Sequence, residues 1–255
     1  MLIATWNLNN RFGAVRFRLE AAEASAAIGA DLLVFTEYFP KDNHARFAGV
    51  LAAAGWTHLM VSADSGEPAN RVLVASRVPL EPYALQLPDF DRQFRSNLLG
   101  ASISSLGIRI VGVRVPAYSN RNSLIKSWEW LEATAESLAG APSIILGDLN
   151  FAPTPTRGPA GASFHRILQA GWHRAAPSGA ASYFGHNGAR TEIDHILATK
   201  SCDLSEARYV TEAGGFRLAG DREAISDHAA VLARVRVLEA EAEIGRLTDE
   251  RARNS

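Results

Sequence analysis

The sequence contains one cysteine, Cys202, in 255 residues, and one thiol cannot build a disulfide framework. It has no run of about 20 apolar residues, the length that a membrane-spanning helix requires. Its first ten residues, MLIATWNLNN, lack the basic segment of a secretory signal. No repeat recurs at a fixed period. These absences argue against disulfide-rich, membrane-spanning and repeat proteins, and we expect a cytoplasmic protein without a membrane partner.

Charge of one sign is also missing, because the formal net charge is −1. Lysine is scarce, with 3 residues against 23 arginines, a bias that genomic base composition explains better than function does. Any attraction for nucleic acid must therefore come from local basic groups. What is plentiful is apolar sequence: 47% of the residues are hydrophobic, enough to fill the core of one large domain.

Hydrophobic patterning predicts strands that alternate with helices along much of the chain. Many strands are wholly apolar, which indicates sheets with both faces covered. We therefore predict a four-layer α/β sandwich, two packed sheets flanked by helices, over residues 1–237, followed by a charged tail over residues 238–255. The predicted helices span 16–29, 44–54, 121–138 and 164–170, and the predicted strands span 2–7, 31–37, 56–63, 70–77, 96–104, 107–115, 143–150, 181–184, 192–198, 205–211 and 228–235.

Polar side chains stand at five predicted strand ends. Residues two apart on a strand face the same side, so Asn7 with Asn9, and Asp148 with Asn150, can each point together. Strand ends in one sandwich can meet at a common edge and hold side chains rigidly. The five segments are TWNLN (5–9), LLVFTE (32–37), IILGDLN (144–150), TEIDHIL (191–197) and ISDHA (225–229).

The chemistry of these residues favours phosphoryl transfer. Converging carboxylates repel one another unless a cation lies among them, and oxygen ligands without cysteine select a hard ion such as Mg²⁺ or Mn²⁺. A hard ion, amide donors and a histidine can neutralise phosphate oxygens while a carboxylate activates water. Each segment alone has a simpler explanation, since GDLN suits a turn and SDH suits a helix cap or strand entry. Their joint occurrence in this order is what indicates function.

Together the five segments resemble the successive motifs of the endonuclease/exonuclease/phosphatase superfamily, which includes DNase I-like nucleases, abasic-site endonucleases and phosphatases. The resemblance covers residues 5 to about 235, and it implies the same four-layer sandwich. For the metal site it implies Glu37 as the principal Mg²⁺ ligand. Asn7 would help to hold the metal or the phosphate, and Asn9 and Asp227 would lie near the metal. Several family nucleases carry Asp where this chain has Asn9.

For the chemical step the resemblance implies four further roles. Asp148 would orient and deprotonate the attacking water, and Asn150 would donate to the phosphate. His228 would contact a non-bridging oxygen, and Asp194 would orient His228. His195, beside Asp194, is expected to face the packing side of its strand.

Arg114 departs from the family pattern. In VGVRVPAYSN (111–120) the family usually places Tyr or His where this chain has Arg114. Arg114 could bind phosphate as a bidentate donor. Alternatively, it could be salt-bridged on the outer face, with Tyr118 reaching into the site instead; we favour a site role for Arg114.

The substrate is open to three hypotheses from the sequence. The resemblance favours a nuclease or other phosphodiesterase with a nucleic-acid partner, DNA first. A phosphomonoesterase acting on a small metabolite or lipid headgroup is the alternative, and a non-catalytic binding module is disfavoured because the whole residue set is present. Further candidate phosphate contacts are Arg71, Arg95, Arg121, Lys126 and Arg190, and candidate stacking residues are Tyr38, Phe39, Phe151 and Phe184.

Overall fold

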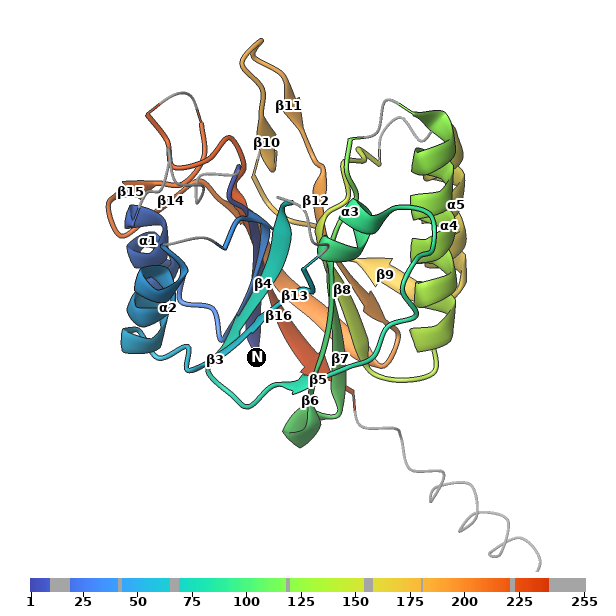
Figure 1. The fold of residues 1–255 in the computed structure, drawn as a ribbon, viewed down its shortest axis with the longest axis horizontal. Helices are drawn as coiled ribbons and strands as arrows, with labels where there is room; N and C mark the ends of the chain where they lie inside the picture. Colours follow the sequence, from blue (N-terminus) through green and yellow to red (C-terminus); the bar gives the residue numbers. More distant parts are fainter. Residues whose placement is uncertain are drawn as a thin grey trace, which may run out of the picture.

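The computed structural model describes residues 1–9, 19–40, 43–64, 69–117, 120–153, 158–179, 181–220 and 223–238, without the Gln93 side chain. Two six-stranded mixed sheets dominate the fold (Figure 1). In spatial order, the first sheet contains β13 (Cys202–Val210), β16 (Ala230–Val237), β1 (Leu2–Asn7), β2 (Leu32–Tyr38), β4 (Arg71–Ser76) and β3 (His58–Val61). The second contains β5 (Glu81–Pro82), β6 (Leu98–Ile103), β7 (Ile108–Arg114), β8 (Ser143–Asp148), β12 (Asp194–Thr199) and β9 (Trp172–Arg174).

Helices cover the outer face of each sheet, as Figure 1 shows, and complete the predicted four-layer sandwich. On one side lie α1 (Glu20–Ile28) and α2 (His44–Ala53), and on the other lie α4 (Arg121–Leu138) and α5 (Gly158–Gln169). A short helix, α3 (Arg92–Ser96), precedes β6. Asn120 caps α4, since its side chain accepts hydrogen bonds from the backbone N–H groups of Asn122 and Ser123.

Alternation along the strands divides the apolar residues into three clusters. On β8, Ile144 and Leu146 pack between the sheets, whereas Ile145 faces the α4–α5 side. On β12, Ile196 faces between the sheets and Leu197 faces the helices. This period of two explains the wholly apolar strands of the sequence, because both faces are buried. It also decides which way each strand's final polar residue points.

The predicted loop over 151–163 is partly wrong, because α5 begins at Gly158 rather than near Phe164. Proline and glycine suggested a loop, but Pro159 suits the first turn of a helix, where its missing N–H costs nothing. Ala160, Gly161 and Ser163 are small and buried, so they let the helix lie close to its neighbours.

The predicted strand over 181–184 corresponds to β10 (Tyr183–Phe184), which is shorter than predicted. Several other short strands were not predicted: β5, β9, β11 (Arg190–Thr191), which pairs with β10, and the β14 (Glu212–Ala213) and β15 (Phe216–Arg217) pair. Pairs of two or three residues are too short to show a period. Residues 239–255 lie outside the described part, so the separate tail stays a prediction. No helix among the described residues is long and apolar enough to cross a membrane.

Candidate active site

The candidate site lies at one end of the layer between the two sheets. Asn7 ends β1, Asp148 ends β8 and Asp194 begins β12. Asp148 and Asp194 stand directly opposite each other in the β8–β12 ladder. By the strand alternation, each of these residues shares its face with the apolar residues that pack between the sheets. Asn7 Nδ2 donates to Asp148 Oδ2 at 2.8 Å, so one hydrogen bond joins the two sheets at the site.

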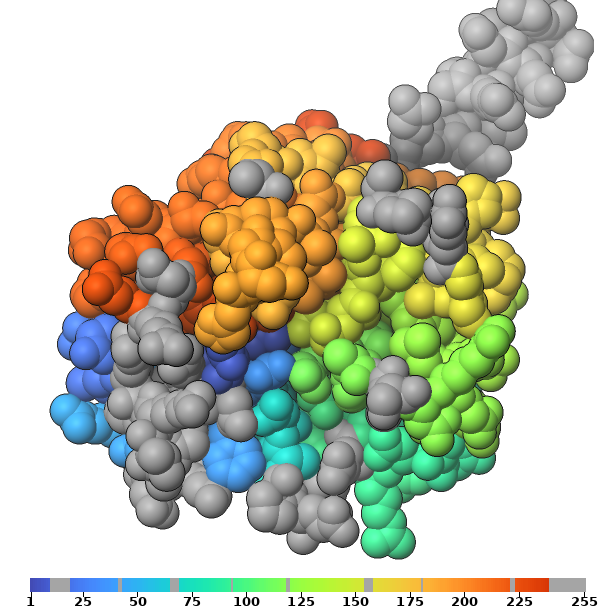
Figure 2. Space-filling view, turned by 90° about the horizontal axis from the view of Figure 1, so that it is seen from above, coloured from blue at the N-terminus to red at the C-terminus, as the bar shows by residue number. Residues whose placement is uncertain are grey.

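A cavity of about 300 Å³ opens at this edge. Seen from above (Figure 2), the blue end of the N-terminal strand lies mid-face, between the orange β10–β11 hairpin and green segments of the second sheet. Six residues predicted from the sequence line the cavity: Asn9, Glu37, Asp148, Asn150, Asp227 and His228. A larger cavity of about 440 Å³ lies between residues 83–90 and α4; of the predicted contacts it is lined by Lys126, and by none of the predicted catalytic or metal residues.

Asp148 is almost fully buried and is held by several donors. Its Oδ1 accepts from the Asn150 backbone N–H at 2.9 Å, and its Oδ2 accepts from the Asn150 side-chain amide at 3.0 Å. That amide also donates to the Val115 carbonyl at 2.8 Å, so both of its hydrogens already have acceptors. Asn150 therefore orients Asp148 in this structure, whereas the resemblance implied a donor to phosphate.

The surroundings of Asp148 raise the pKa of its carboxyl group above the ordinary value for an aspartate. Burial, followed by the negative charge of Asp194, raises the pKa of Asp148 to about 7. His228, Arg114 and the Asn150 N–H act in the opposite direction and do not cancel the rise. A carboxyl group with a pKa near 7 can gain and lose a proton readily at neutral pH, which suits a general base.

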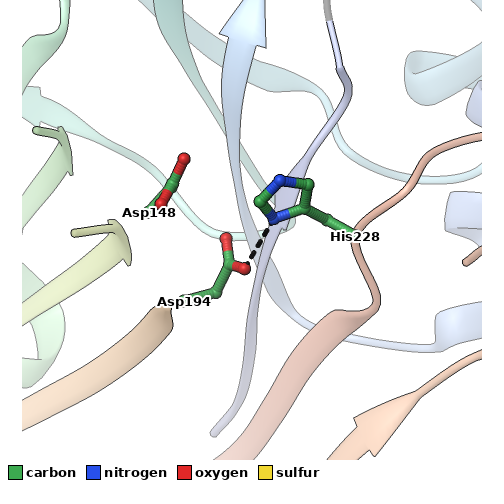
Figure 3. A group of neighbouring side chains, drawn as sticks. All are labelled: Asp148, Asp194 and His228. Atoms are coloured by element: carbon green, nitrogen blue, oxygen red, sulfur yellow. Dashed lines mark hydrogen bonds and ion pairs between the residues drawn. The ribbon is translucent and has the colours of Figure 1, made fainter. Parts of the chain in front are cut away.

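His228 and Asp194 form a buried pair beside Asp148 (Figure 3). His228 Nδ1 donates to Asp194 Oδ2 at 2.7 Å. Burial alone would lower the pKa of His228, but the charges of Asp194, Asp148 and Asp227 raise it to about 9. At neutral pH the imidazole is therefore protonated, with Nδ1 held by Asp194. The free Nε2 lies 3.8 Å from Asp227 Oδ1, on a residue that lines the cavity.

Arg114 lies on the inner face and contacts the site. Its Nη2 is 2.7 Å from Glu37 Oε1, and its Nε is 3.8 Å from Asp148 Oδ2. Arg114 ends β7, where it pairs with Asp148 of β8. It shares a strand face with Gly112, where an added Cβ would meet Val34 and Val72 of the opposite sheet. Arg114 is thus salt-bridged, but to a site residue rather than on the outer face.

Three cavity residues have left-handed backbones: φ is 47° at Asn9, 51° at Glu37 and 46° at Asn150. Asparagine tolerates this region well, whereas glutamate rarely adopts it. At Glu37 the β2–β4 register shifts between Phe35 and Tyr38, so a bulge redirects the side chain. Gly147, with φ 148°, is required before Asp148, because a Cβ there would lie 1.8 Å from the Val113 carbonyl oxygen.

The donor groups fit a hard divalent cation. The carboxylates of Glu37, Asp148 and Asp227 line the cavity, and Asp194 lies beside it, hydrogen-bonded to His228. In the described part of the chain, their cationic partners are Arg114 and His228. Among the described residues, Oδ1 of Asp194 and Oδ1 of Asp227 are buried without a hydrogen-bond partner. Oxygen donors of this kind select Mg²⁺ or Mn²⁺.

Two donor groupings are possible. Ligand atoms of Asp148, Asp194 and His228 lie within 4.8 Å of one another. However, His228 Nδ1 and Asp194 Oδ2 are already joined by a hydrogen bond. The oxygens of Glu37, Asp227 and Asn9 line the open cavity, and we favour that side for a metal.

Some predicted contacts lie elsewhere. Arg95 does not line the cavity, and its Nε donates to the Pro88 carbonyl at 2.6 Å. Arg71 pairs with Asp64. Tyr38 and Phe151 are buried core residues and cannot stack on a base. Tyr118 lies outside the described residues.

Three functional neighbours escaped the sequence reading. Tyr183 lines the cavity, with its ring 5.0 Å from the His228 ring. The Ser182 hydroxyl accepts from the backbone N–H of Asp194 at 3.0 Å. The Ser226 hydroxyl accepts from the His228 N–H at 3.1 Å and donates to the Asn7 carbonyl at 2.8 Å. The position of Ser226, one residue before the Asp227-His228 dipeptide, was the available signal.

Residues 4–228 match the profile of the Endonuclease/Exonuclease/phosphatase family. No curated protein matches the chain. The fold is similar to that of an AP endonuclease from Archaeoglobus fulgidus, with 19% identity, a TM-score of 0.71, and coverage of 93% of this chain and 100% of the other. It is similar to an endonuclease/exonuclease/phosphatase from Beutenbergia cavernae, with 19% identity, a TM-score of 0.72, and coverage of 94% and 72%. It is also similar to the 3′ phosphatase NExo from Neisseria bound to product DNA hairpin, with 23% identity, a TM-score of 0.70, and coverage of 92% and 99%.

Proposed function

The chain belongs to the endonuclease/exonuclease/phosphatase family, and from this premise we propose that it is a divalent-metal-dependent nuclease that hydrolyses phosphodiester bonds in DNA. The family consists of phosphoester hydrolases. The observation that carries the proposal is the convergence of Asp148 and the Asp194–His228 pair on one cavity. That arrangement offers a base and an acid within one small space, which phosphoester hydrolysis requires.

Asp148 is the base in this mechanism. Its carboxylate takes one proton from a water molecule, and the water oxygen attacks the phosphorus in line with the bond that breaks. Asn7 and Asn150 hold the carboxylate in place through hydrogen bonds of 2.8 and 3.0 Å. Because these donors come from both sheets, the orientation of Asp148 is fixed before substrate arrives.

His228 is the acid. Its Nε2–H donates to a phosphate oxygen and stabilises the charge that develops there. Asp194 holds the opposite ring nitrogen, which keeps the imidazole protonated and directed into the cavity.

Mg²⁺ or Mn²⁺ would be held by Glu37, Asn9 and Asp227. Asn7 would support this set through its hydrogen bond with Asn9. A bound divalent ion supplies charge neutralisation of the phosphate and of the leaving oxygen. Asn7 Oδ1 accepts from the Asn9 backbone N–H at 2.8 Å, so Asn7 contributes to the proposed metal site by positioning Asn9.

DNA is the favoured substrate because of the named relatives: one is an AP endonuclease and another is bound to product DNA. The β10–β11 hairpin projects from one end of the sandwich in Figure 1, and its residue Tyr183 lines the cavity. The hairpin also carries Arg190, which lies over the Phe184 ring at 4.5 Å. A cation and an aromatic ring on one projecting hairpin suit the backbone and bases of a nucleic acid.

The small cavity also favours a second candidate. About 300 Å³ accommodates a terminal phosphate and little more, and the NExo relative is described as a 3′ phosphatase. A phosphomonoesterase would use the same base and acid, so the two candidates differ in substrate and not in machinery.

The test is a hydrolysis assay with purified protein and Mg²⁺ or Mn²⁺. Labelled single-stranded DNA, duplex DNA, abasic duplex, RNA and 3′-phosphorylated DNA are offered in parallel. We expect cleavage of at least one DNA substrate, its loss with EDTA, and a fall of about 10³-fold in Asp148→Asn. Asp203→Asn, a half-exposed aspartate on β13, is the matched control and should keep full activity.

Release of phosphate from the 3′-phosphorylated DNA, with every internal bond intact, would favour the monoesterase. Equal activity in wild type and Asp148→Asn would contradict the mechanism. Activity that survives EDTA would contradict the metal dependence.

A further inference from the structure

The Arg114–Glu37 ion pair uses only part of the guanidinium. Arg114 Nη2 reaches Glu37 Oε1 at 2.7 Å, and no described carboxylate oxygen lies within hydrogen-bonding distance of its Nε. Two other arginines form full bidentate pairs through Nε and Nη2. Arg166 bonds both oxygens of Glu132, at 2.5 and 2.7 Å, and Arg234 bonds both oxygens of Glu206, at 2.8 and 3.0 Å. The Arg114 pair is therefore the incomplete one of the three.

The second donor of this edge of the guanidinium, Arg114 Nε, is in an unfavourable environment. Arg114 Nε is buried and has no hydrogen-bond partner among the described residues, and its nearest acidic oxygen, on Asp148, is 3.8 Å away. A buried donor without a partner destabilises the folded state, because its hydrogen bond to water is lost and not replaced. Nε and Nη2 form the edge that matches two oxygens of a carboxylate or phosphate. A tetrahedral oxyanion would satisfy both donors at once, whereas Glu37 satisfies one.

Besides pairing with Arg114, Glu37 is a proposed ligand of the divalent ion. Its side chain is 15% exposed and lines the cavity, where we place the divalent ion. A divalent cation bound at the Glu37 carboxylate would lie close to the Arg114 guanidinium, and the two positive charges would repel each other.

We propose that Arg114 and the divalent ion compete for Glu37, and that a phosphate group in the cavity ends the competition by drawing Arg114 to itself. Metal and phosphate then bind with positive coupling. Arg114 thereby makes the site selective for phosphate-bearing substrates, because metal binds well only when an oxyanion is present. The inference rests on the proposed function for the identity of both ligands.

The movement is confined to the side chain. The Arg114 backbone is fixed in β7 by its pairing with β8, and its N–H donates to the Asn97 carbonyl at 2.9 Å. Rotation of the side chain alone can carry the guanidinium from Glu37 toward the cavity, and no strand has to shift.

The test measures metal binding directly, without turnover. Mn²⁺ affinity is measured by electron paramagnetic resonance of free Mn²⁺, with and without inorganic phosphate, for wild type and Arg114→Gln. In wild type we expect phosphate to tighten Mn²⁺ binding about tenfold, and Mn²⁺ to tighten phosphate binding by the same factor. In Arg114→Gln we expect Mn²⁺ alone to bind about tenfold tighter than in wild type, and the phosphate effect to shrink.

Two further variants make the result interpretable. Arg166→Gln removes the same charge from an exposed pair and should leave Mn²⁺ affinity unchanged. Glu37→Gln should weaken Mn²⁺ binding at least tenfold if Glu37 is a ligand. Thermal unfolding of each variant confirms that it is folded.

Unchanged or weaker Mn²⁺ binding in Arg114→Gln overturns the competition. If Glu37→Gln nevertheless weakens Mn²⁺ binding, only this inference fails and the metal site stands. If Glu37→Gln has no effect, the inference fails together with the metal assignment, and the hydrolysis assay decides separately whether the proposed activity survives.

Discussion

The chain contains the dipeptide Asp-His twice at the candidate site, and the side chains of the two dipeptides are placed differently. In Asp194-His195 the aspartate faces the site, while the histidine packs on Phe164 and its Nε2 donates to the Phe151 carbonyl at 2.8 Å. In Asp227-His228 the histidine belongs to the site pair, and the aspartate lines the cavity. Asp194 and His195 lie on β12, where successive side chains point to opposite faces. Asp227 and His228 precede β16, and there both side chains line the cavity.

The two histidines show what sets a buried imidazole's charge. Both are almost fully buried. Burial lowers the pKa of His195 to about 4, because its strongest partner is a neutral carbonyl. His228 has burial against it too, yet the Asp194 carboxylate and its acidic neighbours raise its pKa to about 9. The partner's charge, rather than the depth of burial, separates a neutral packing histidine from a cationic acid.

A serine hydroxyl holds the backbone beside each dipeptide. Ser182 accepts from the N–H groups of Ile193 and Asp194, and Ser226 accepts from the N–H of His228. Both serines are fully buried. The comparison therefore extends to the serines that support the two dipeptides, and four substitutions test it, at Asp194, His195, Ser226 and Ser182.

The largest effect is expected for Asp194→Asn, which removes the charge that keeps His228 protonated. We expect kcat/KM to fall about 10³-fold and the pKa of His228, followed by NMR of the ring, to drop below its wild-type value of about 9. His195→Gln is the control in the same strand and should keep its activity. Full activity in Asp194→Asn would show that the pair is structural.

His195 should produce an intermediate effect, on stability rather than activity. Its folded pKa of about 4 lies below the ordinary value of 6.5, so the unfolded chain binds a proton in that window while the folded chain does not. Its contribution is complete above pH 6.5 and is lost as pH falls to 4, by about 3 kcal/mol at most. Urea unfolding is measured between about pH 9.5 and pH 4 for wild type and His195→Gln, whose amide can still donate to Phe151. Because Asp148 titrates in the lower part of this range with the opposite sign, the His195 effect is read as a difference: wild type should lose stability relative to His195→Gln as pH falls from 7 to 4.

His228 should behave oppositely in the same experiment. Its folded pKa is raised, so its contribution is present below pH 6.5 and disappears as pH rises through about 9. If both histidines changed the free energy of unfolding in the same direction with pH, the comparison would be contradicted.

The smallest effects are expected for the serines. Ser226→Ala leaves the His228 N–H and the Asn7 carbonyl without their partner, which should lower the free energy of unfolding by about 1–2 kcal/mol. Because Ser226 links β1 to the histidine, kcat should fall while KM stays near its wild-type value. Ser182→Ala should cost similar stability and act through Asp194. A loss of stability with unchanged kcat would assign Ser226 to folding alone.

The sequence predicted the sandwich well because its strands are wholly apolar and buried on both faces. Asp148 could be predicted because it ends such a strand, and the β8–β12 ladder places Asp194 opposite it. The start of α5 could not, since the proline and glycine at its first turn are equally common in loops. Tyr183 could not, because it lies in the predicted strand 181–184 without any motif that marks it as a site residue. The contact of Arg114 with Glu37 joins residues 77 positions apart, on strands from different sheets, and no local pattern reports such a pairing.

The left-handed backbone of Glu37 has a consequence for engineering and evolution. Glycine would adopt a φ of 51° without steric cost, but Glu37→Gly would also leave the mostly buried Arg114 without its partner at 2.7 Å. The same change would delete the carboxylate on which the proposed metal site depends. Relief of the backbone at this residue therefore cannot be separated from loss of the ion pair and of the proposed ligand, so a stability screen has no simple route past Glu37.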